Sequence, residues 1–461
     1  FFHDLMRIST SYILKKNFIN CSFRIPEWIT KCNKSNFPYI SYDDVTDGIN
    51  LEEKIFNNTH HIVNIKFQLF EYLCDLLIKI FPNRRVVGIG IGIPIGYKAY
   101  FKLLIKFNVI FLQHNYLNIK CLDKQINVLN ESLDSIIKSD GNNNNAENFK
   151  IIVNNHLRSN LKHDQSTKKY NFIITGASSE PINRVNSVLA KRDAIPVITF
   201  MHGTGDQTMY NEPRIGYCEN SFADYLIGYG ESGIDYENSG YVRGVTDPPK
   251  FIGCSSTTIR EIYKTDKINK INKISDCQWM YVPDSGQLIN QFGPYAGGIN
   301  TLLYLKWQKQ IVKNFPGVLY KKHPKGDFLF RSITDEKMVD LIGVNSEDVN
   351  IIADNFTDVY SKCDGFIFDT VSTAFMIAVA TDKPIIYFNI EKRKFTELAK
   401  KKIKERCLWI DIIDGDTIDM DKIGEQLSTR NFVNNITSKY SLVQGSNKTY
   451  DDALFSLLET F

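Results

Sequence analysis

Short apolar runs separated by amphipathic stretches dominate the chain from about residue 80 onward. Each run is long enough for one buried strand, and most of the intervals have the apolar spacing of a helix. Strands that alternate with helices predict parallel sheets covered on both faces. In the first half, strands are predicted at Val86–Ile89, Val109–Leu112, Phe172–Thr175, Val197–Met201 and Tyr225–Ile227, with helices at 97–107, 124–138 and 181–191.

The same alternation begins again near residue 279 and predicts a Rossmann-like domain of at least five parallel strands. Ligands of such sheets gather at the carboxyl ends of the strands. The predicted strands are Trp279–Pro283, Val318–Lys322, Val349–Ile352, Phe366–Asp369, Pro384–Phe388 and Leu408–Ile412, with helices at 302–315, 336–342, 358–361, 373–380 and 394–405.

This organisation predicts an α/β fold with two doubly wound domains that face each other across a cleft. The predicted boundaries are a helical N-terminal extension at 1–80, a first Rossmann-like domain at 81–265, a second at 275–445 and a C-terminal helix at 446–461. We interpret Tyr241–Phe251 as the loop that leads out of the first domain. The lysine-rich stretch 267–273 is then part of the connection to the second.

Charge and cysteine usage exclude several classes of protein. A net charge of +3 gives no global field for nucleic acid. Nine scattered cysteines without a CxxC pair indicate reduced thiols rather than a disulfide framework or a zinc site. Because no apolar stretch reaches the ~18 residues of a membrane span, we expect a cytoplasmic protein.

The lysine runs 392–394 and 400–402 are typical of solvated helix faces. The functional alternative is a basic surface that rests on the anionic cytoplasmic leaflet of the inner membrane.

One candidate phosphate ligand follows a predicted strand of the second domain. His323 and Pro324 come just past Val318–Lys322, where Pro324 ends the ladder because it has no N–H to donate. The imidazole can donate to a phosphate oxygen, with Lys322 beside it as additional charge. The alternative is a surface histidine in a loop.

A second candidate follows the predicted strand that ends at Asp369. Ser372 and Thr373 open an Ala-rich helix, where a hydroxyl is a favoured N-cap. Free N–H groups and two hydroxyls at a helix start also form an anion site, and the two interpretations are compatible. Because this turn and His323 both lie on sheet-end loops of one domain, we expect them to converge on one phosphate-bearing ligand.

The first domain offers two candidates for acid–base chemistry. His202 follows a buried strand, and Gly203 beside it lets the backbone approach a ligand closely, although a structural turn explains the pair equally well. Glu180 begins a helix, where the dipole stabilises a carboxylate whatever its function, and it is placed to take a proton from a hydroxyl. The glycines of 88–96 lack GxGxxG spacing, which rules out a nicotinamide fingerprint and leaves a ligand-lining loop.

This succession resembles bacterial GT-B transferases that build surface polysaccharides. The residues that carry the resemblance are the His202-Gly203 turn, Lys321-Lys322-His323-Pro324, and Asp369-Thr-Val-Ser372-Thr373 followed by Lys383-Pro-Ile-Ile. The families are capsule and O-antigen glycosyltransferases, sialyltransferases, Kdo transferases and CDP-glycerol glycerophosphotransferases. The acidic Asp/Glu-Asp-Gly motif of the sialyltransferases is missing from the first domain, and Phe200-Met201 replaces the Trp that precedes His-Gly in the glycerophosphotransferases.

The resemblance implies a metal-independent glycosyltransferase of capsule or lipopolysaccharide synthesis. It implies a nucleotide-sugar donor, CMP-linked as with Kdo, a glycan or glycolipid acceptor, and no cofactor or metal. The second domain would bind the donor phosphate through His323, Lys322, Ser372 and Thr373, and Gly203, Asp369 and Pro324 would line the cleft. Glu180 or His202 would deprotonate the acceptor. The alternatives are a CDP-polyol phosphotransferase, a UDP-sugar 2-epimerase and a non-catalytic partner protein of the same fold.

Overall fold

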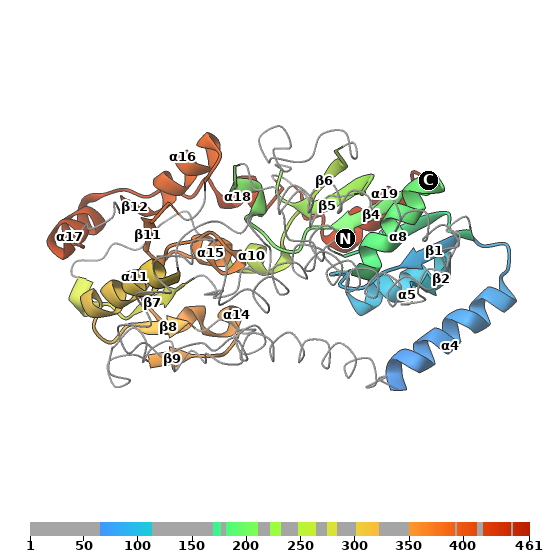
Figure 1. Cartoon of the computed structure of the whole chain (residues 1–461), viewed down its shortest axis with the longest axis horizontal. Helices are drawn as coiled ribbons and strands as arrows, with labels where there is room; N and C mark the ends of the chain where they lie inside the picture. Colours follow the sequence, from blue (N-terminus) through green and yellow to red (C-terminus); the bar gives the residue numbers. More distant parts are fainter. Residues whose placement is uncertain are drawn as a thin grey trace, which may run out of the picture.

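Two parallel six-stranded sheets, one in each half of the chain, form the framework of the protein (Figure 1). The computed structural model describes residues 65–112, 169–176, 181–210, 222–231, 248–263, 274–283, 301–321, 350–391, 394–412, 418–443 and 446–461. Within these residues the predicted α/β fold of two doubly wound units is confirmed. The helix predicted at 124–138 and that at 336–342 lie outside the described residues.

The first sheet has the strand order β2-β1-β3-β4-β5-β6, and every pairing is parallel. Strands β3 and β4 in its middle are apolar runs that are buried along their whole length, as expected for a sheet covered on both faces. The bounds are β1 Val86–Ile89, β2 Asn108–Phe111, β3 Phe172–Thr175, β4 Val197–Phe200, β5 Tyr225–Tyr229 and β6 Lys250–Cys254.

Helices cover both faces of the first sheet. One face shares a hydrophobic cluster with α4 (Ile65–Ile80), α5 (Tyr97–Lys106) and α19 (Tyr450–Leu458). The other face packs against α8 (Pro181–Arg192), where Ile173 and Val197 contact Ala190. The alternation of side chains along each strand therefore supplies two separate cores.

The second sheet has the order β12-β11-β10-β7-β8-β9, also wholly parallel. Its strands are β7 Trp279–Val282, β8 Leu319–Lys321, β9 Asn350–Ile352, β10 Gly365–Phe368, β11 Ile385–Asn389 and β12 Leu408–Asp411. The helices with them are α11 Thr301–Asn314, α14 Phe356–Val359, α15 Thr373–Val379, α16 Glu397–Arg406 and α17 Met420–Thr429.

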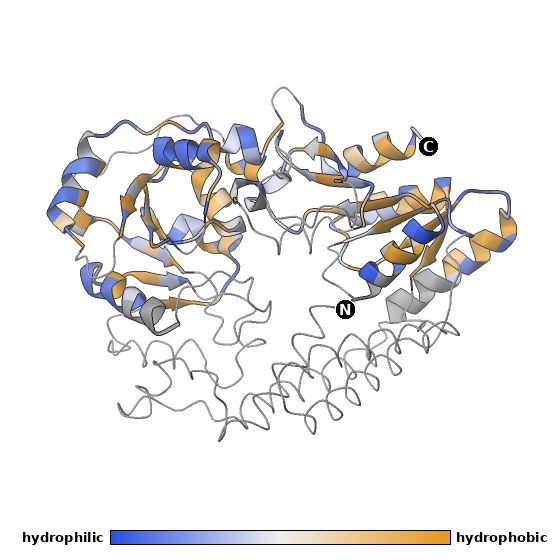
Figure 2. Cartoon of the chain, turned by 45° about the horizontal axis from the view of Figure 1, so that its top comes forward, coloured by the Kyte–Doolittle hydropathy of each residue, from blue (hydrophilic) through white to orange (hydrophobic). Residues whose placement is uncertain are grey.

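Strand β10 shows how this second sheet is sandwiched. Phe366 and Phe368 lie in the cluster that includes α15 and α16, whereas Ile367 between them lies in the cluster with α11 and α17. In Figure 2 the strands of both sheets are largely orange, in keeping with their apolar composition.

The two halves share a core. Met201, Met209, Leu226 and Ile259 come from the first half but belong to the same hydrophobic cluster as α15 and the adjacent face of β10. Burial of apolar surface contributes roughly 25 cal/mol per Å². A continuous cluster of this kind therefore fixes how the halves sit against each other.

The chain returns from the second half to the first along the carboxyl ends of β5 and β6. The segment around α18 (Thr437–Tyr440) accepts backbone hydrogen bonds there: Glu231 N–H donates to the Lys439 carbonyl at 3.0 Å and Ser256 N–H to that of Ser441 at 2.9 Å. The C-terminal helix α19 then packs on the first sheet, where the Tyr450 hydroxyl donates to the Met201 carbonyl at 3.1 Å.

Two details differ from the sequence-based prediction. Lys250–Cys254 forms the sixth strand of the first sheet, followed by α10 (Thr257–Ile262), so the end of the predicted loop Tyr241–Phe251 is wrong. Helix α16 begins at Glu397 rather than at 394, because Thr396 caps it by accepting from Ala399 N–H at 3.2 Å. Among the described residues, no helix is long and apolar enough to cross a membrane.

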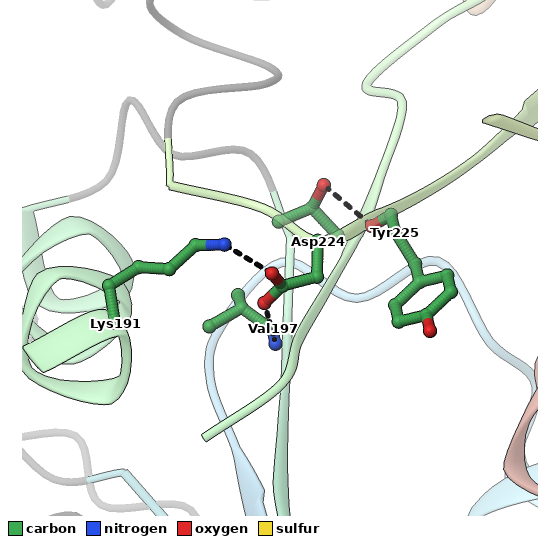
Figure 3. Close-up of polar contacts among 5 residues, drawn as sticks. Lys191, Val197, Asp224 and Tyr225 are labelled. Atoms are coloured by element: carbon green, nitrogen blue, oxygen red, sulfur yellow. Dashed lines mark hydrogen bonds and ion pairs between the residues drawn. The ribbon is translucent and has the colours of Figure 1, made fainter. Parts of the chain in front are cut away.

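A half-buried ionic contact holds the amino ends of β4, β5 and β6 together (Figure 3). The Asp224 carboxylate pairs with the Lys191 ammonium group from α8 and accepts from Val197 N–H of β4 at 2.8 Å. The Asp224 backbone also bonds to β4 and to Lys250 of β6, at 2.9 and 2.8 Å. This contact lies at the edge of the sheet opposite the ligand-binding ends.

We predict that Asp224→Ala lowers the free energy of unfolding by roughly 1–3 kcal/mol, because it leaves a half-buried ammonium group and a backbone N–H without their acceptor. The matched control is Asp354→Ala, which removes an exposed ion pair in which the Asp354 carboxylate lies 3.7 Å from the Lys362 ammonium group. Such pairs contribute ~0–1 kcal/mol. Urea denaturation of both variants measures the difference, and equal losses would contradict the structural role of Asp224.

Candidate functional site

The turn after β10 lies at the place where the second sheet is expected to bind a ligand. Strand order reverses between β7 and β10, so the crevice outside their carboxyl ends is the topological switch point. Phe368 at the end of β10 pairs with Val282 at the end of β7. The residues that follow Phe368, from Asp369 to Thr373, therefore border that crevice.

Asp369, the first residue of this turn, is fixed by hydrogen bonds from β7 and α11. Its side chain is buried, and one carboxylate oxygen accepts from the Tyr281 hydroxyl at 2.5 Å and from the Trp307 indole N–H at 3.2 Å. Tyr281 belongs to β7 and Trp307 to α11. Two donors that satisfy a buried carboxylate make it a positioning group for the turn. Neither donor had been singled out from the sequence.

Ser372 is the N-cap of α15, as predicted: its hydroxyl accepts from Phe375 N–H at 3.3 Å. Thr373 is the first helical residue, and it is exposed. Helix α15 has seven residues, so its macrodipole is smaller than that of a long helix. An anion bound here would depend mainly on the two hydroxyls, the local backbone N–H groups and whatever faces them.

What faces the Ser372–Thr373 turn is the loop that carries His202. A Cβ atom built on Gly203 would lie 2.5 Å from the Thr373 hydroxyl oxygen, so the two loops are in direct contact. Gly205 continues the contact: a Cβ there would lie 3.0 Å from Val371, and its φ of +110° suits only glycine. The His202 side chain is exposed. The structure thus brings together His202, Gly203, Ser372 and Thr373.

Backbone pairing locks this loop to the second half of the chain. Met209 and Phe395 form an antiparallel bridge, in which Tyr210 N–H donates to the Lys394 carbonyl at 2.9 Å and Thr396 N–H to the Thr208 carbonyl at 3.0 Å. Within the loop, Thr208 N–H donates to the Gly205 carbonyl at 2.9 Å. The loop is therefore held against the second domain on both sides of Gly205.

One hydroxyl of this loop stands out among its polar groups. The Thr204 side chain is buried, and within the described part of the chain its oxygen has no hydrogen-bond partner. An unsatisfied buried hydroxyl is costly, at about 1–3 kcal/mol. Thr204 had not been singled out from the sequence, and no local pattern distinguishes it.

The remaining predicted site residues lie outside the described residues: Glu180, Lys322, His323 and Pro324. Strands β8 and β10 flank β7, so the carboxyl ends of β8 and β10 lie about two strand spacings, or roughly 10 Å, apart. In the sequence, Lys322, His323 and Pro324 follow β8 and Glu180 follows β3. Their roles stay predictions.

The glycine-rich stretch after β1 is closed by packing rather than open. Asn183 of α8 is buried and binds Ile91 twice, accepting from its N–H and donating to its carbonyl at 3.0 Å each. A Cβ atom on Gly176 would lie 2.4 Å from the Gly92 carbonyl oxygen. These glycines therefore allow backbones to meet at the switch point between β1 and β3.

A buried guanidinium supports α15 from its far end. Arg406 donates to the carbonyls of Val379, Thr381 and Lys383 at 3.0, 2.9 and 2.8 Å. Burial lowers the pKa of Arg406 to about 10, which still leaves it charged at neutral pH. Burial raises the pKa values of the Cys363 and Cys407 thiols to about 12, so neither supplies a thiolate nucleophile at neutral pH.

Comparison with known proteins gives weak structural similarities. No family model matches the chain, and no curated protein matches its sequence. Anabaena HepE in complex with UDP and glucose is similar at 11% identity, over 84% of this chain and 94% of that one, with a TM-score of 0.38. Phytolacca americana UGT2 with UDP-2-fluoro-glucose and pterostilbene is similar at 10% identity, over 85% of this chain and 96% of that one, with a TM-score of 0.30. Thermosulfurimonas dismutans KpsC, a β-Kdo 2,7 transferase, is similar at 14% identity, over 68% of this chain and 96% of that one, with a TM-score of 0.24. The fold assignment rests on the sheet topology above.

We predict that Gly203→Ala lowers the free energy of unfolding by about 1–3 kcal/mol, because its methyl group displaces Thr373. The double variant Gly203→Ala/Thr373→Ala removes the opposing hydroxyl and should recover most of the loss. The control Gly424→Ala in α17, whose new Cβ would meet Ile274 at 3.6 Å, should be neutral or stabilising. Urea denaturation measures the free energy of unfolding of each variant. If the double variant is no more stable than Gly203→Ala, the contact between Gly203 and Thr373 is disproved.

Proposed function

We propose that this chain is a GT-B glycosyltransferase that transfers a sugar from a nucleotide-activated donor to a hydroxyl of a glycan acceptor. The observation that carries the proposal is the direct contact between the His202–Gly203 loop and the Ser372–Thr373 turn at the switch point of the second sheet. The exposed His202 belongs to one loop, and the exposed Thr373 and half-buried Ser372 belong to the turn that this loop contacts. That arrangement suits a reaction between two ligands held by different domains.

The second domain would bind the donor phosphate. Ser372, Thr373 and the first backbone N–H groups of α15 would offer donors on one side of the crevice, and Lys322, His323 and Pro324, which follow β8 in the sequence, would supply the others. The carboxyl ends of β8 and β10 lie roughly two strand spacings apart, which suits a phosphate group held above β7. Stabilising the charge that develops on the leaving nucleotide is the main catalytic requirement.

The acceptor would approach over β1 and β3 of the first sheet. The carboxyl ends of β5 and β6 are covered by the segment around α18, and the loop after β4 is paired with residues 394–396. Glu180 follows β3 in the sequence, which is why the acceptor is assigned to that half of the sheet edge. We assign the role of general base to Glu180 or His202. Variants of the two residues, described below, show which of them takes the proton.

The finer proposal is a CMP-linked donor such as CMP-Kdo, for a capsule or lipopolysaccharide acceptor. It is supported by the Lys-x-His-Pro and Ser-Thr succession of the second domain. Thermal-shift measurements with CMP, CDP, UDP and GDP test it, because a ligand that binds the folded state raises apparent stability. A stronger shift with UDP would instead favour a UDP-sugar donor or the epimerase alternative, and CDP would favour polyol-phosphate transfer.

We predict that Ser372→Ala lowers both stability, by ~1 kcal/mol through loss of the cap, and nucleotide affinity. Thr373→Val keeps the shape of the side chain and should lower affinity with little loss of stability. The control is Asp419→Ala. Asp419 caps α17 by accepting from Lys422 N–H at 3.0 Å, so its loss should lower stability and leave nucleotide affinity unchanged. Calorimetric titration of the best nucleotide from the panel gives the affinities. Unchanged affinity in Thr373→Val would refute the phosphate site.

We predict that His202→Ala lowers kcat by about 10²–10⁴-fold with nucleotide affinity retained if His202 is the base. If it binds donor phosphate, affinity falls as well. Glu180→Gln should show the first pattern if Glu180 is the base instead. Nucleotide release from the donor, with and without acceptor, is the measurement. Product formed without any acceptor would indicate an epimerase, and full activity in both variants would exclude both assignments.

We predict that EDTA leaves the transfer rate unchanged, because the proposed phosphate ligands are hydroxyls, backbone N–H groups and an imidazole. Among the described residues, no three His, Cys, Asp or Glu side chains are grouped so as to hold a metal ion. The rate is measured before and after chelation, with added Mg²⁺ and Mn²⁺ as a control. A loss that either ion restores would overturn the metal-independent mechanism.

A further inference from the structure

Helix α5 carries an exposed apolar row along one side. Tyr97, Phe101 and Ile105 are 89%, 59% and 68% exposed. Their spacing of four residues places them one above another on the same helix face. The opposite face of α5 is buried through Ala99, Leu103 and Leu104, so the helix has a packed side and an apolar outer side.

A row of lysines runs directly beside the apolar row. Lys98, Lys102 and Lys106 each follow one of those apolar residues in sequence and are exposed. The Lys102 ammonium lies 4.1 Å from the centre of the Phe455 ring, and Lys106 forms an exposed pair with Glu459 at 3.1 Å. No acidic residue occurs within α5 itself. The outer side of α5 is therefore both apolar and cationic.

Helix α4 carries a second exposed apolar row. Tyr72, Leu76 and Ile80 repeat the four-residue spacing and are exposed. Below them Leu73, Cys74 and Leu77 pack in the same hydrophobic cluster as the inner side of α5. In Figure 2 the coloured part of α4, at the far right, is largely orange.

The position of α5 relates this surface to the site. The helix begins just after Gly96, at the end of the loop that leaves β1 at the carboxyl edge of the first sheet. Among the described residues, the contacts of the α18 segment and of residues 394–396 lie at the ends of β4, β5 and β6, and β1 and β3 form the other half of that edge. The exposed rows therefore start beside the part of the cleft that we assign to the acceptor.

The lysine-rich helix α16 differs in its surroundings. Lys400 and Lys404 lie over the Trp409 ring, at 6.0 and 5.3 Å from its centre, and Leu398 is the one large hydrophobic side chain of that helix counted as exposed. Because no row of exposed apolar side chains accompanies Leu398, the lysine run at 400–402 lacks the apolar contact that docking on a bilayer requires.

We propose that the α5 face, defined as Tyr97, Lys98, Phe101, Lys102, Ile105 and Lys106, docks on an anionic phospholipid bilayer. Aromatic and aliphatic side chains enter the boundary between headgroups and acyl chains, and lysines are attracted by the anionic headgroups. Exposed apolar rows without lysines would suit a protein partner equally well, and the regular cationic row is what favours lipid. The proposal does not rest on glycosyl transfer, because binding to a bilayer needs no donor or acceptor.

Cosedimentation with vesicles of phosphatidylglycerol and phosphatidylcholine in equal parts tests the proposal on the full chain. The wild type should bind these vesicles and bind pure phosphatidylcholine vesicles weakly. Lys98→Ser/Phe101→Ser should lower the vesicle partition coefficient by about tenfold or more, since it removes one charge and one ring from the face. Raising NaCl toward ~1 M, where the Debye length is ~3 Å, should also weaken binding.

The matched control is Leu398→Ser/Lys401→Ser on α16, which removes one apolar and one lysine side chain at the same spacing and should leave binding unchanged. Thermal denaturation verifies that both double variants fold. The proposal is overturned if the wild type does not bind anionic vesicles, if it binds neutral vesicles equally well, or if the α16 variant loses as much binding. It is also overturned by a wild-type dimer that Lys98→Ser/Phe101→Ser dissociates, because the α5 face would then be covered by a second copy.

Discussion

The contact between the loop after β4 and the turn after β10 determines how the two domains are placed. Gly203 meets the Thr373 hydroxyl with no room for a side chain, and Met201 and Met209 on either side of the loop are buried in the core of the second domain. Interiors of proteins are close-packed, so a shift of a few tenths of an ångström at Gly203 propagates to the Ser372–Thr373 turn. The position of the candidate site thus follows from interdomain packing as much as from either sheet.

Supports at both ends of α15 hold the turn against that contact. At the start, Asp369 is fixed by Tyr281 and Trp307, and Ser372 caps the helix. At the far end, Arg406 binds three carbonyls, and Asn434 adds a bond to the Val379 carbonyl at 2.6 Å. A hydroxyl that must meet a phosphate within a few tenths of an ångström needs such preorganisation, because its rotamer and its helix are then fixed before the ligand arrives.

The sequence predicted the interior strands well, since a strand buried on both faces is a short apolar run wherever it occurs, as in Phe172–Thr175 and Gly365–Phe368. It failed at β6, where Lys250 and Gly253 interrupt the apolar pattern of an edge strand. The sequence also did not predict which residues of the candidate site contact each other. Asp369 and Tyr281 are 88 residues apart, and Gly203 meets Thr373 only through folding, so no local pattern encodes either contact.

The contacts along the carboxyl edge of the first sheet bear on how an acceptor would reach the site. Contacts with the second domain and with the returning chain occupy the ends of β4, β5 and β6, whereas α5 begins after the loop that leaves β1. Asn183 binds Ile91 twice and so fixes the glycine-rich loop after β1. In the proposed reaction, an acceptor chain would lie along this loop and present one hydroxyl to His202 or Glu180. If the α5 face rests on a bilayer, this loop lies near the membrane surface, where a lipid-linked glycan would be held at high effective concentration.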